Sequence, residues 1–281
     1  YYAMYALFCN TKVVDASKLL LPATTLAPHC YQRMFYNCEQ LIYPPLLLPA
    51  KSISSYGYDH MFEGCSSLIE TSDMLATTVN DHGCGEMYRN CIKLKESKPI
   101  RITNIGTYGL YRMFIGCTSL EYPPELPAPQ SDSFSGFCFS GMFTGCSNLK
   151  ECAKFPEGNY KCSNFVFSEM YRGCVNITNP CEFPSGYRIN EQYTGNVFSG
   201  MFNGCVNLQT APDLSWVNHS GKRMFYRMFK GCTSLTVPPK MPNIQFGADQ
   251  EICREMFYEC SSLSESPILY SNYVPVDGYR D

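Results

Sequence analysis

Cysteine is the residue type in this sequence with the most obvious chemistry. The chain has 17 cysteines among 281 residues, a number that suggests a disulfide framework or metal sites. If equivalent repeats stack, equivalent side chains form a ladder with parallel Cβ vectors, whereas a disulfide needs its Cβ atoms turned toward each other. We therefore predict a structural ladder of reduced thiols, which Cys9 should extend at its start. Nine cysteines share one position of a repeated motif: Cys38, Cys65, Cys91, Cys117, Cys146, Cys174, Cys205, Cys232 and Cys260.

The remaining cysteines give no clear indication of disulfides. Cys30 precedes Cys38 by eight residues, which on a helix corresponds to about 12 Å and is too far for a disulfide. Cys152 and Cys181 occupy similar places in adjacent repeats. A disulfide between these two repeats and a pair of unpaired thiols therefore both stay open.

Other catalytic and metal-binding patterns are missing from the sequence. There is no Cys-x-x-Cys, and the four histidines are scattered along the chain, so we predict no metal site and no cofactor. No nucleophile elbow and no phosphate-binding loop occurs. Glutamate pairs such as Glu251 and Glu255 are expected to be a solvated surface. We predict no catalytic residues and no enzyme.

The charge balance excludes further classes. The net charge of −3 argues against a nucleic-acid-binding protein, which normally has a basic surplus on one face. No stretch approaches the ~18 apolar residues that a membrane helix needs. No signal peptide or anchor is visible, and we treat the chain as mature or trimmed.

The cysteine positions belong to a repeat that begins with Met-Phe or Met-Tyr. Its copies start at Met34, Met61, Met87, Met113, Met142, Met170, Met201, Met228 and Met256. Repeats of this length stack into solenoids. We predict one solenoid over residues 1–270, with about nine clear repeats and one degenerate N-terminal repeat. Residues 271–281 are expected to form a C-terminal tail or cap.

Within each repeat, the apolar spacing predicts the secondary structure. Bulky residues at −3, 0, +1 and +4 from the methionine fit one face of a helix, and the Gly or Asn before the cysteine is typical of a helix end. A short extended run follows, as at residues 41–43, and ends at prolines. We predict an α/β repeat solenoid that is leucine-rich-repeat-like, with short parallel strands on one face and short helices on the other.

The motifs resemble those of BspA-like leucine-rich repeat proteins. The resemblance is carried by Leu41 through Pro49-Ala50, followed by Met61-Phe62-x-Gly-Cys-x-Ser-Leu, and by Leu21-Pro22-Ala23 before Met34-Phe35. It covers roughly residues 5–270. The linking segments 151–167 and 180–198 are longer and lack Leu-Pro-Ala, which bears on the curvature and not on the fold. The resemblance implies an extracellular or cell-surface location, or a phage virion, and an attachment function without catalysis.

The segments between the prolines and the next motif vary and carry large aromatic residues. Rigid exposed aromatics are favoured at interfaces, so we predict a binding surface, while the alternative is that they fill gaps between helices. The leading interpretation is a non-catalytic, adhesin-type binding module of a bacterial surface, with a protein or glycan ligand on a host or microbial surface. The alternative is a structural or receptor-binding component of a phage virion or surface assembly, with oligomers formed through the solenoid ends. The candidate residues are Tyr56, Tyr108, Phe134, Tyr160, Tyr187, Tyr193, Trp216 and Phe246.

Overall fold

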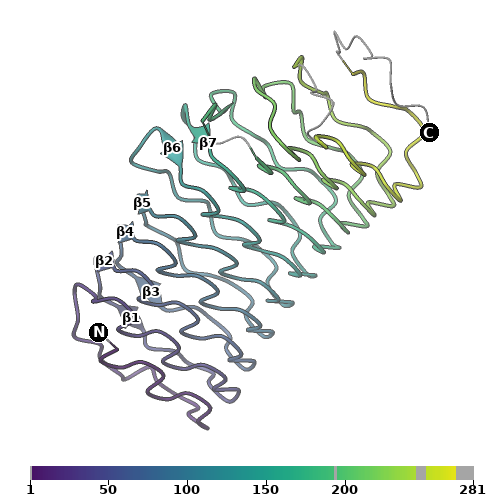
Figure 1. Cartoon of the computed structure of the whole chain (residues 1–281). Helices are drawn as coiled ribbons and strands as arrows, with labels where there is room; N and C mark the ends of the chain where they lie inside the picture. Colours follow the sequence, from purple (N-terminus) through teal and green to yellow (C-terminus); the bar gives the residue numbers. More distant parts are fainter. Residues whose placement is uncertain (1, 193–194, 245–250, 270–281) are drawn as a thin grey trace.

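The chain forms an elongated, curved stack of coils, in which each coil contains one copy of the repeat (Figure 1). This computed structural model describes residues 2–192, 195–244 and 251–269. The coils follow one another in sequence order along the stack. The candidate residues Tyr193 and Phe246 and the predicted tail 271–281 lie outside the described residues. Within the described part, no helix is long and apolar enough to cross a membrane.

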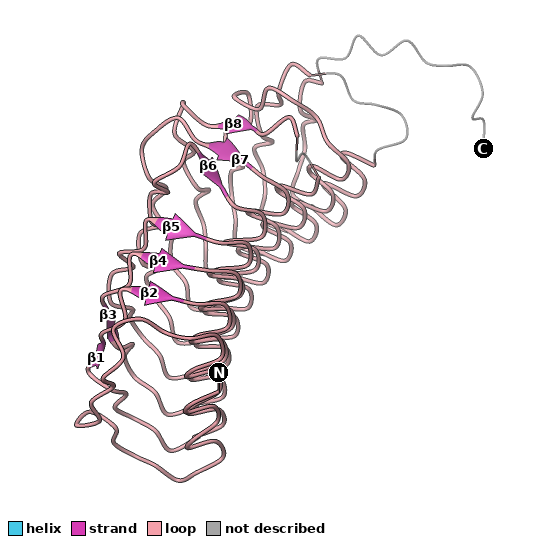
Figure 2. Ribbon diagram, turned by 60° about the vertical axis from the view of Figure 1, so that its left-hand side comes forward, coloured by secondary structure: helices cyan, strands magenta, loops and turns pink. Residues whose placement is uncertain are grey.

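Short parallel strands pair between successive coils, which confirms the predicted parallel pairing (Figure 2). The sheets are β1-β3, β2-β4-β5 and β6-β7-β8. The predicted strand at residues 41–43 is different: it contributes only the bridge between Tyr43 and Asp15. The strands are β1 (Leu47–Leu48), β2 (Ser52–Ile53), β3 (Asp73–Met74), β4 (Thr78–Val79), β5 (Asn104–Ile105), β6 (Ser133–Phe134), β7 (Lys161–Cys162) and β8 (Arg188–Ile189).

The predicted helices are wrong, because the described residues of the Met-Phe segments form overlapping turns instead. An α-helix directs every interior N–H to the carbonyl four residues earlier. Here the Met34 N–H donates to Tyr31 O of its own coil (3.2 Å), but the Phe35 N–H donates to Met61 O of the next coil (2.9 Å). This alternation continues from coil to coil. We call this side of the solenoid the turn face.

Left-handed backbone recurs at every fourth residue of the turn face. In one coil it falls at His29, Arg33 and Asn37, with φ of 59°, 55° and 54°. A positive φ at the third residue of a turn is typical of type II turns and is incompatible with a continuous right-handed helix. The apolar spacing that predicted a helix is therefore satisfied by a four-residue turn unit. The Gly, Asn or Glu before each motif cysteine does adopt positive φ, but inside this unit rather than at a helix end.

The repeated apolar residues form one continuous core. In the coil that starts at Met61, the side chains of Met61, Phe62, Cys65 and Leu68 are all fully buried. The aromatic ring after each methionine stacks on its neighbour in the next coil from Phe8 to Phe257, with centroid separations of 5.1–5.8 Å. The core therefore runs along the whole described stack rather than around one centre.

The repeated cysteines form a cysteine column beside these stacked core rings. The thiol of Cys65 donates to Phe35 O of the preceding coil at 3.1 Å, and Cys117 donates to Tyr88 O at 3.1 Å. All 17 cysteines are free. In the first coil, the position that corresponds to the repeated cysteine is occupied by Thr11, whose Oγ1 lies 3.4 Å from Cys38 Sγ. Cys9 is two residues away from that position, so the expectation for Cys9 is wrong.

Candidate functional site

A column of stacked aromatic side chains runs along the outside of the turn face. The predicted residues Tyr56 and Tyr108 belong to it, and both are partly exposed. The sequence interpretation missed the other members, although each stands five residues before the first motif residue and a repeat alignment shows them. Neighbouring rings are stacked with their centroids 4.3–4.9 Å apart, so they cover one another's faces inside the column. The column consists of Tyr2, His29, Tyr56, His82, Tyr108, Phe137 and Phe165.

The other described candidates form an interior cluster. Phe134 and Tyr187 are only 1% and 3% exposed, so their prediction as contact residues is wrong. Trp216 is partly exposed but packs against Phe183 and Tyr187, with centroid distances of 5.4 and 6.1 Å. Tyr160 contacts Phe134 at 5.3 Å. These rings fill the wider coils of the longer repeats, which is the alternative that the sequence left open.

A network of charged side chains lies beside the aromatic column on the turn face. The buried Asp59 carboxylate accepts a hydrogen bond from Gln32 Nε2 (2.8 Å) and lies 3.5 Å from His60 Nε2. The other ring nitrogen of His60 is hydrogen-bonded to Glu63, and Arg89 pairs with Glu63 and with Glu86 of its own coil. The network therefore joins three successive coils.

Burial and neighbouring charges shift the protonation of this network. Burial raises the pKa of the Asp59 carboxyl. Burial lowers the pKa of His60, but the hydrogen bond with Glu63 and the charge of Asp59 outweigh it, so the pKa is raised overall. The ligand atoms of His60, Glu63 and Glu86 lie within 4.8 Å of one another. Histidines that are scattered in the sequence did not indicate this grouping, because the coils bring together residues about one repeat apart.

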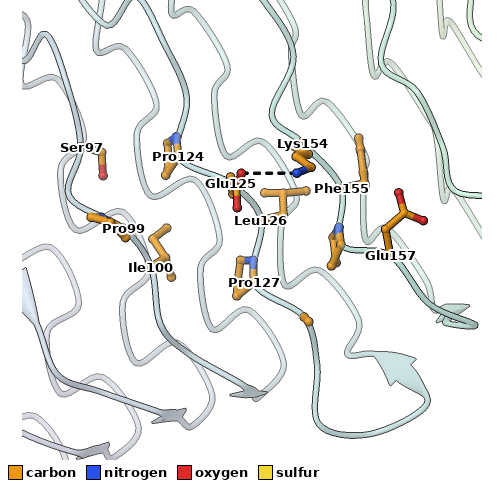
Figure 3. A pocket seen from close by; sticks show the side chains of 12 residues that line it. Ser97, Pro99, Ile100, Pro124, Glu125, Leu126, Pro127, Lys154, Phe155 and Glu157 are labelled. Carbon is orange, nitrogen blue, oxygen red and sulfur yellow. Dashed lines mark ion pairs between the residues drawn. The ribbon is translucent and has the colours of Figure 1, made fainter.

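A hollow of about 520 Å³ is lined by residues that include Ile100, Pro124 and Pro127 (Figure 3). In the coil after β3, the residues that would continue the pairing of β1 and β3 are Pro99 and Ile100. Proline has no N–H and cannot continue the ladder, and Pro124 and Pro127 interrupt the following coil. Between residues 122–129 and the neighbouring coils, the described backbone forms one hydrogen bond, from Leu126 N to Lys154 O (3.0 Å).

A second hollow of about 470 Å³ adjoins the first, and the two share Lys154, Phe155 and Glu157. We call the two hollows together the proline groove. The buried Leu126 and Phe155 contribute to its apolar lining. The free thiols of Cys152 and Cys181 also line the second hollow, where burial raises the pKa of Cys152. Sequence reasoning expected prolines to end strands but not that the gap would open into a groove.

Comparisons with known proteins give remote structural likenesses only. No protein-family model matches the chain, and no curated protein matches it. A leucine-rich repeat protein from Bacteroides ovatus is 20% identical over 92% of this chain with a TM-score of 0.45, and this chain spans 61% of that protein's length. A leucine-rich cell surface protein from Faecalibacterium prausnitzii is 15% identical over 81% of this chain and 78% of its own length, with a TM-score of 0.23.

Proposed function

We propose that this chain is a non-catalytic binding module of adhesin type, which displays the proline groove on a rigid repeat scaffold at a cell surface. The ligand is an extended segment of a protein or glycan on a host or microbial surface. The observation that carries the proposal is the pair of adjoining hollows, which share the lining residues Lys154, Phe155 and Glu157. The surface location rests on the resemblance of the repeat motif to BspA-like proteins.

The construction of the groove suits an extended ligand. The exposed Pro99 and the partly exposed Ile100 supply apolar surface, while Glu125 and Lys154 form an exposed ion pair at its rim, with 3.7 Å between Lys154 Nζ and Glu125 Oε1 (Figure 3). Ligand sites typically combine a concave apolar surface with a few polar groups that set orientation. Because prolines fix the backbone of the walls, binding should order few residues, which favours affinity.

The test is a binding screen of the full chain against arrays of extracellular-matrix proteins, host glycans and bacterial polysaccharides. Two variants block the groove: Ala128→Trp fills the first hollow, and Lys154→Glu reverses a rim charge. Ala128 is exposed. Lys154 is 72% exposed and its ion pair stabilises the fold by at most about 1 kcal/mol, so both variants should stay folded. We expect each to weaken binding at least about tenfold, which corresponds to about 1.4 kcal/mol.

Lys240→Glu is the matched control. Lys240 is 81% exposed and forms a similar ion pair with Asp213 of the preceding coil at 3.4 Å, but it does not line the groove. The Lys240→Glu variant should bind the ligand as tightly as the original chain does. Unchanged binding by both groove variants would show that the ligand uses another surface, and the aromatic column would be the next one to alter.

A further inference from the structure

We propose that His60, Glu63 and Glu86 form a binding site for one divalent transition-metal ion of the Zn²⁺ type. The site lies on the turn face, and none of its residues lines the proline groove. It therefore does not depend on the function proposed above. The ligand atoms of these three side chains already lie within 4.8 Å of one another.

The backbone holds these three side chains in register. His60 and Glu86 occupy equivalent positions of successive coils, with φ of 53° and 49°, and Glu63 stands three residues after His60. The His60 N–H donates to Gly85 O of the next coil (2.9 Å), which fixes the two coils beside Glu86. Zinc ligands lie about 2.0–2.2 Å from the ion. The proposed site therefore requires side-chain rotations that bring the three donors to that distance.

The Asp59 carboxylate faces the ring nitrogen of His60 that is not bonded to Glu63. Metal-binding histidines almost always donate their other ring N–H to a carboxylate or carbonyl, which orients the ring. The Asp59 carboxylate is 3.5 Å from His60 Nε2, and the residue is only 4% exposed. Gln32 holds Asp59 in place and is itself hydrogen-bonded to His29 Nδ1 (2.8 Å). This chain of contacts turns Nδ1 of His60 toward Glu63, as a ligand nitrogen requires.

The charges of the network also favour a dication. Asp59, Glu63 and Glu86 bring three carboxylates together, against the single guanidinium of Arg89. The carboxylates therefore outnumber the fixed cation of the network, and a divalent ion offsets the excess. Arg89 competes with the ion for both glutamates, but its side chain is 37% exposed and can turn into solvent.

The ligand types select the ion. One imidazole nitrogen and two carboxylates suit Zn²⁺ and Co²⁺, whereas Mg²⁺ and Ca²⁺ prefer oxygen ligands alone. The nearby core thiols do not compete, because metal binding needs a thiolate. Burial raises the pKa of Cys65 and Cys91, so both stay protonated at neutral pH.

The test is a titration of the full chain with Co²⁺, read by visible absorption. We expect one Co²⁺ to bind without a thiolate charge-transfer band, and Zn²⁺ to displace it. His60→Ala should abolish binding, and Asp59→Asn should weaken it about tenfold, the usual cost of a lost outer partner. Arg89→Met, which removes the competing cation, should tighten binding. Circular dichroism checks that each variant is folded.

A charged cluster without histidine provides the control. Glu255 lies among Arg227, Lys230 and Arg254 near the other end of the stack, and Glu255→Gln should bind Co²⁺ like the original chain. Absence of binding in both the original chain and Arg89→Met overturns the proposal. It is equally overturned if His60→Ala titrates like the original chain, or if the spectrum shows thiolate ligands.

Discussion

The most unusual feature at the scale of single residues is left-handed backbone in ordinary side chains. The structure places 22 described non-glycine residues at φ between 49° and 64°. Each such residue costs roughly 1–2 kcal/mol relative to right-handed backbone. Two repeated gains offset the cost: alternate N–H groups donate to the next coil, and residues such as Tyr56 and His82 stack there at 4.8 Å.

Glycine removes this cost where it precedes the cysteine, and this gives a first prediction. Gly173 has φ of 73°, and a Cβ added there meets Gly145 Cα only at 3.8 Å, so strain rather than space opposes a side chain. Gly173→Ala should lower the free energy of unfolding by about 1 kcal/mol, measured from the urea midpoint. Gly136→Ala is the control, because its φ is not positive and its nearest neighbour is 3.5 Å away. It should be neutral or slightly stabilising, and equal losses in the two variants would refute the account.

At the scale of elements, the sequence predicts the core better than the backbone. Met61, Phe62, Cys65 and Leu68 are buried as predicted, because burial depends on which positions recur. Their spacing fits both a helix and a four-residue turn unit, and only hydrogen bonds to the next coil decide between them. Those bonds join residues about one repeat apart, so a local pattern does not reveal them.

Contacts between coils also explain why the candidate sites differ from the prediction. His60 and Glu86 meet because the coils stack in register, and neither residue signals the other within its own repeat. Phe134 and Tyr187 were expected on the surface because they stand in variable segments, but the longer coils there enclose space that large rings must fill. Prolines were expected to end strands at positions such as 41–43, whereas the strand pairing that Pro99 interrupts is that of β1 and β3, which lies later in the repeat.

The cysteine column is the element that predicts a response to pH. Burial raises the pKa of the Cys146 thiol from its ordinary value of 9.0 to about 12. The fold therefore favours the neutral thiol: its contribution is complete below about pH 9 and is lost as the pH rises toward 12. Burial raises the pKa of Cys117 and Cys174 as well. We expect the urea midpoint to fall steadily above pH 9.

A matched variant isolates this effect from other alkaline titrations. Cys146→Ala should be less stable at neutral pH, because it loses the hydrogen bond to Phe114 O (3.1 Å) and leaves a small cavity. It should also lose less of its remaining stability between pH 8 and 11 than the original chain does, since one thiol fewer ionises. Parallel pH curves for the two proteins would contradict a contribution from the column.

At the scale of the whole molecule, the groove lies beside an interruption of the stack. The sheets β2-β4-β5 and β6-β7-β8 are separate, and the repeat is longer where they part: Met113 and Met142 are 29 residues apart, against 26 for Met87 and Met113. The turn face nevertheless continues across this point, as the Phe114 N–H donates to Met142 O at 2.9 Å. One side of the solenoid is therefore regular and holds the coils together, while the other side varies and opens the groove (Figure 2).

A destabilising substitution should loosen mainly the coils around it, because each coil is stabilised mainly by its neighbours. Phe167 is fully buried in a middle coil and stacks on Phe139 and Phe198, at 6.3 and 6.0 Å. Phe167→Ala should cost about 3–5 kcal/mol through the cavity it leaves. We expect hydrogen exchange to accelerate in the coils around residues 139–198, while amides near Phe35 and Phe62 keep their protection. The matched variant Phe62→Ala should move the affected region to the first coils. Uniform loss of protection in either variant would mean that the chain unfolds as one cooperative unit, and the groove would then depend on every coil rather than on those that form it.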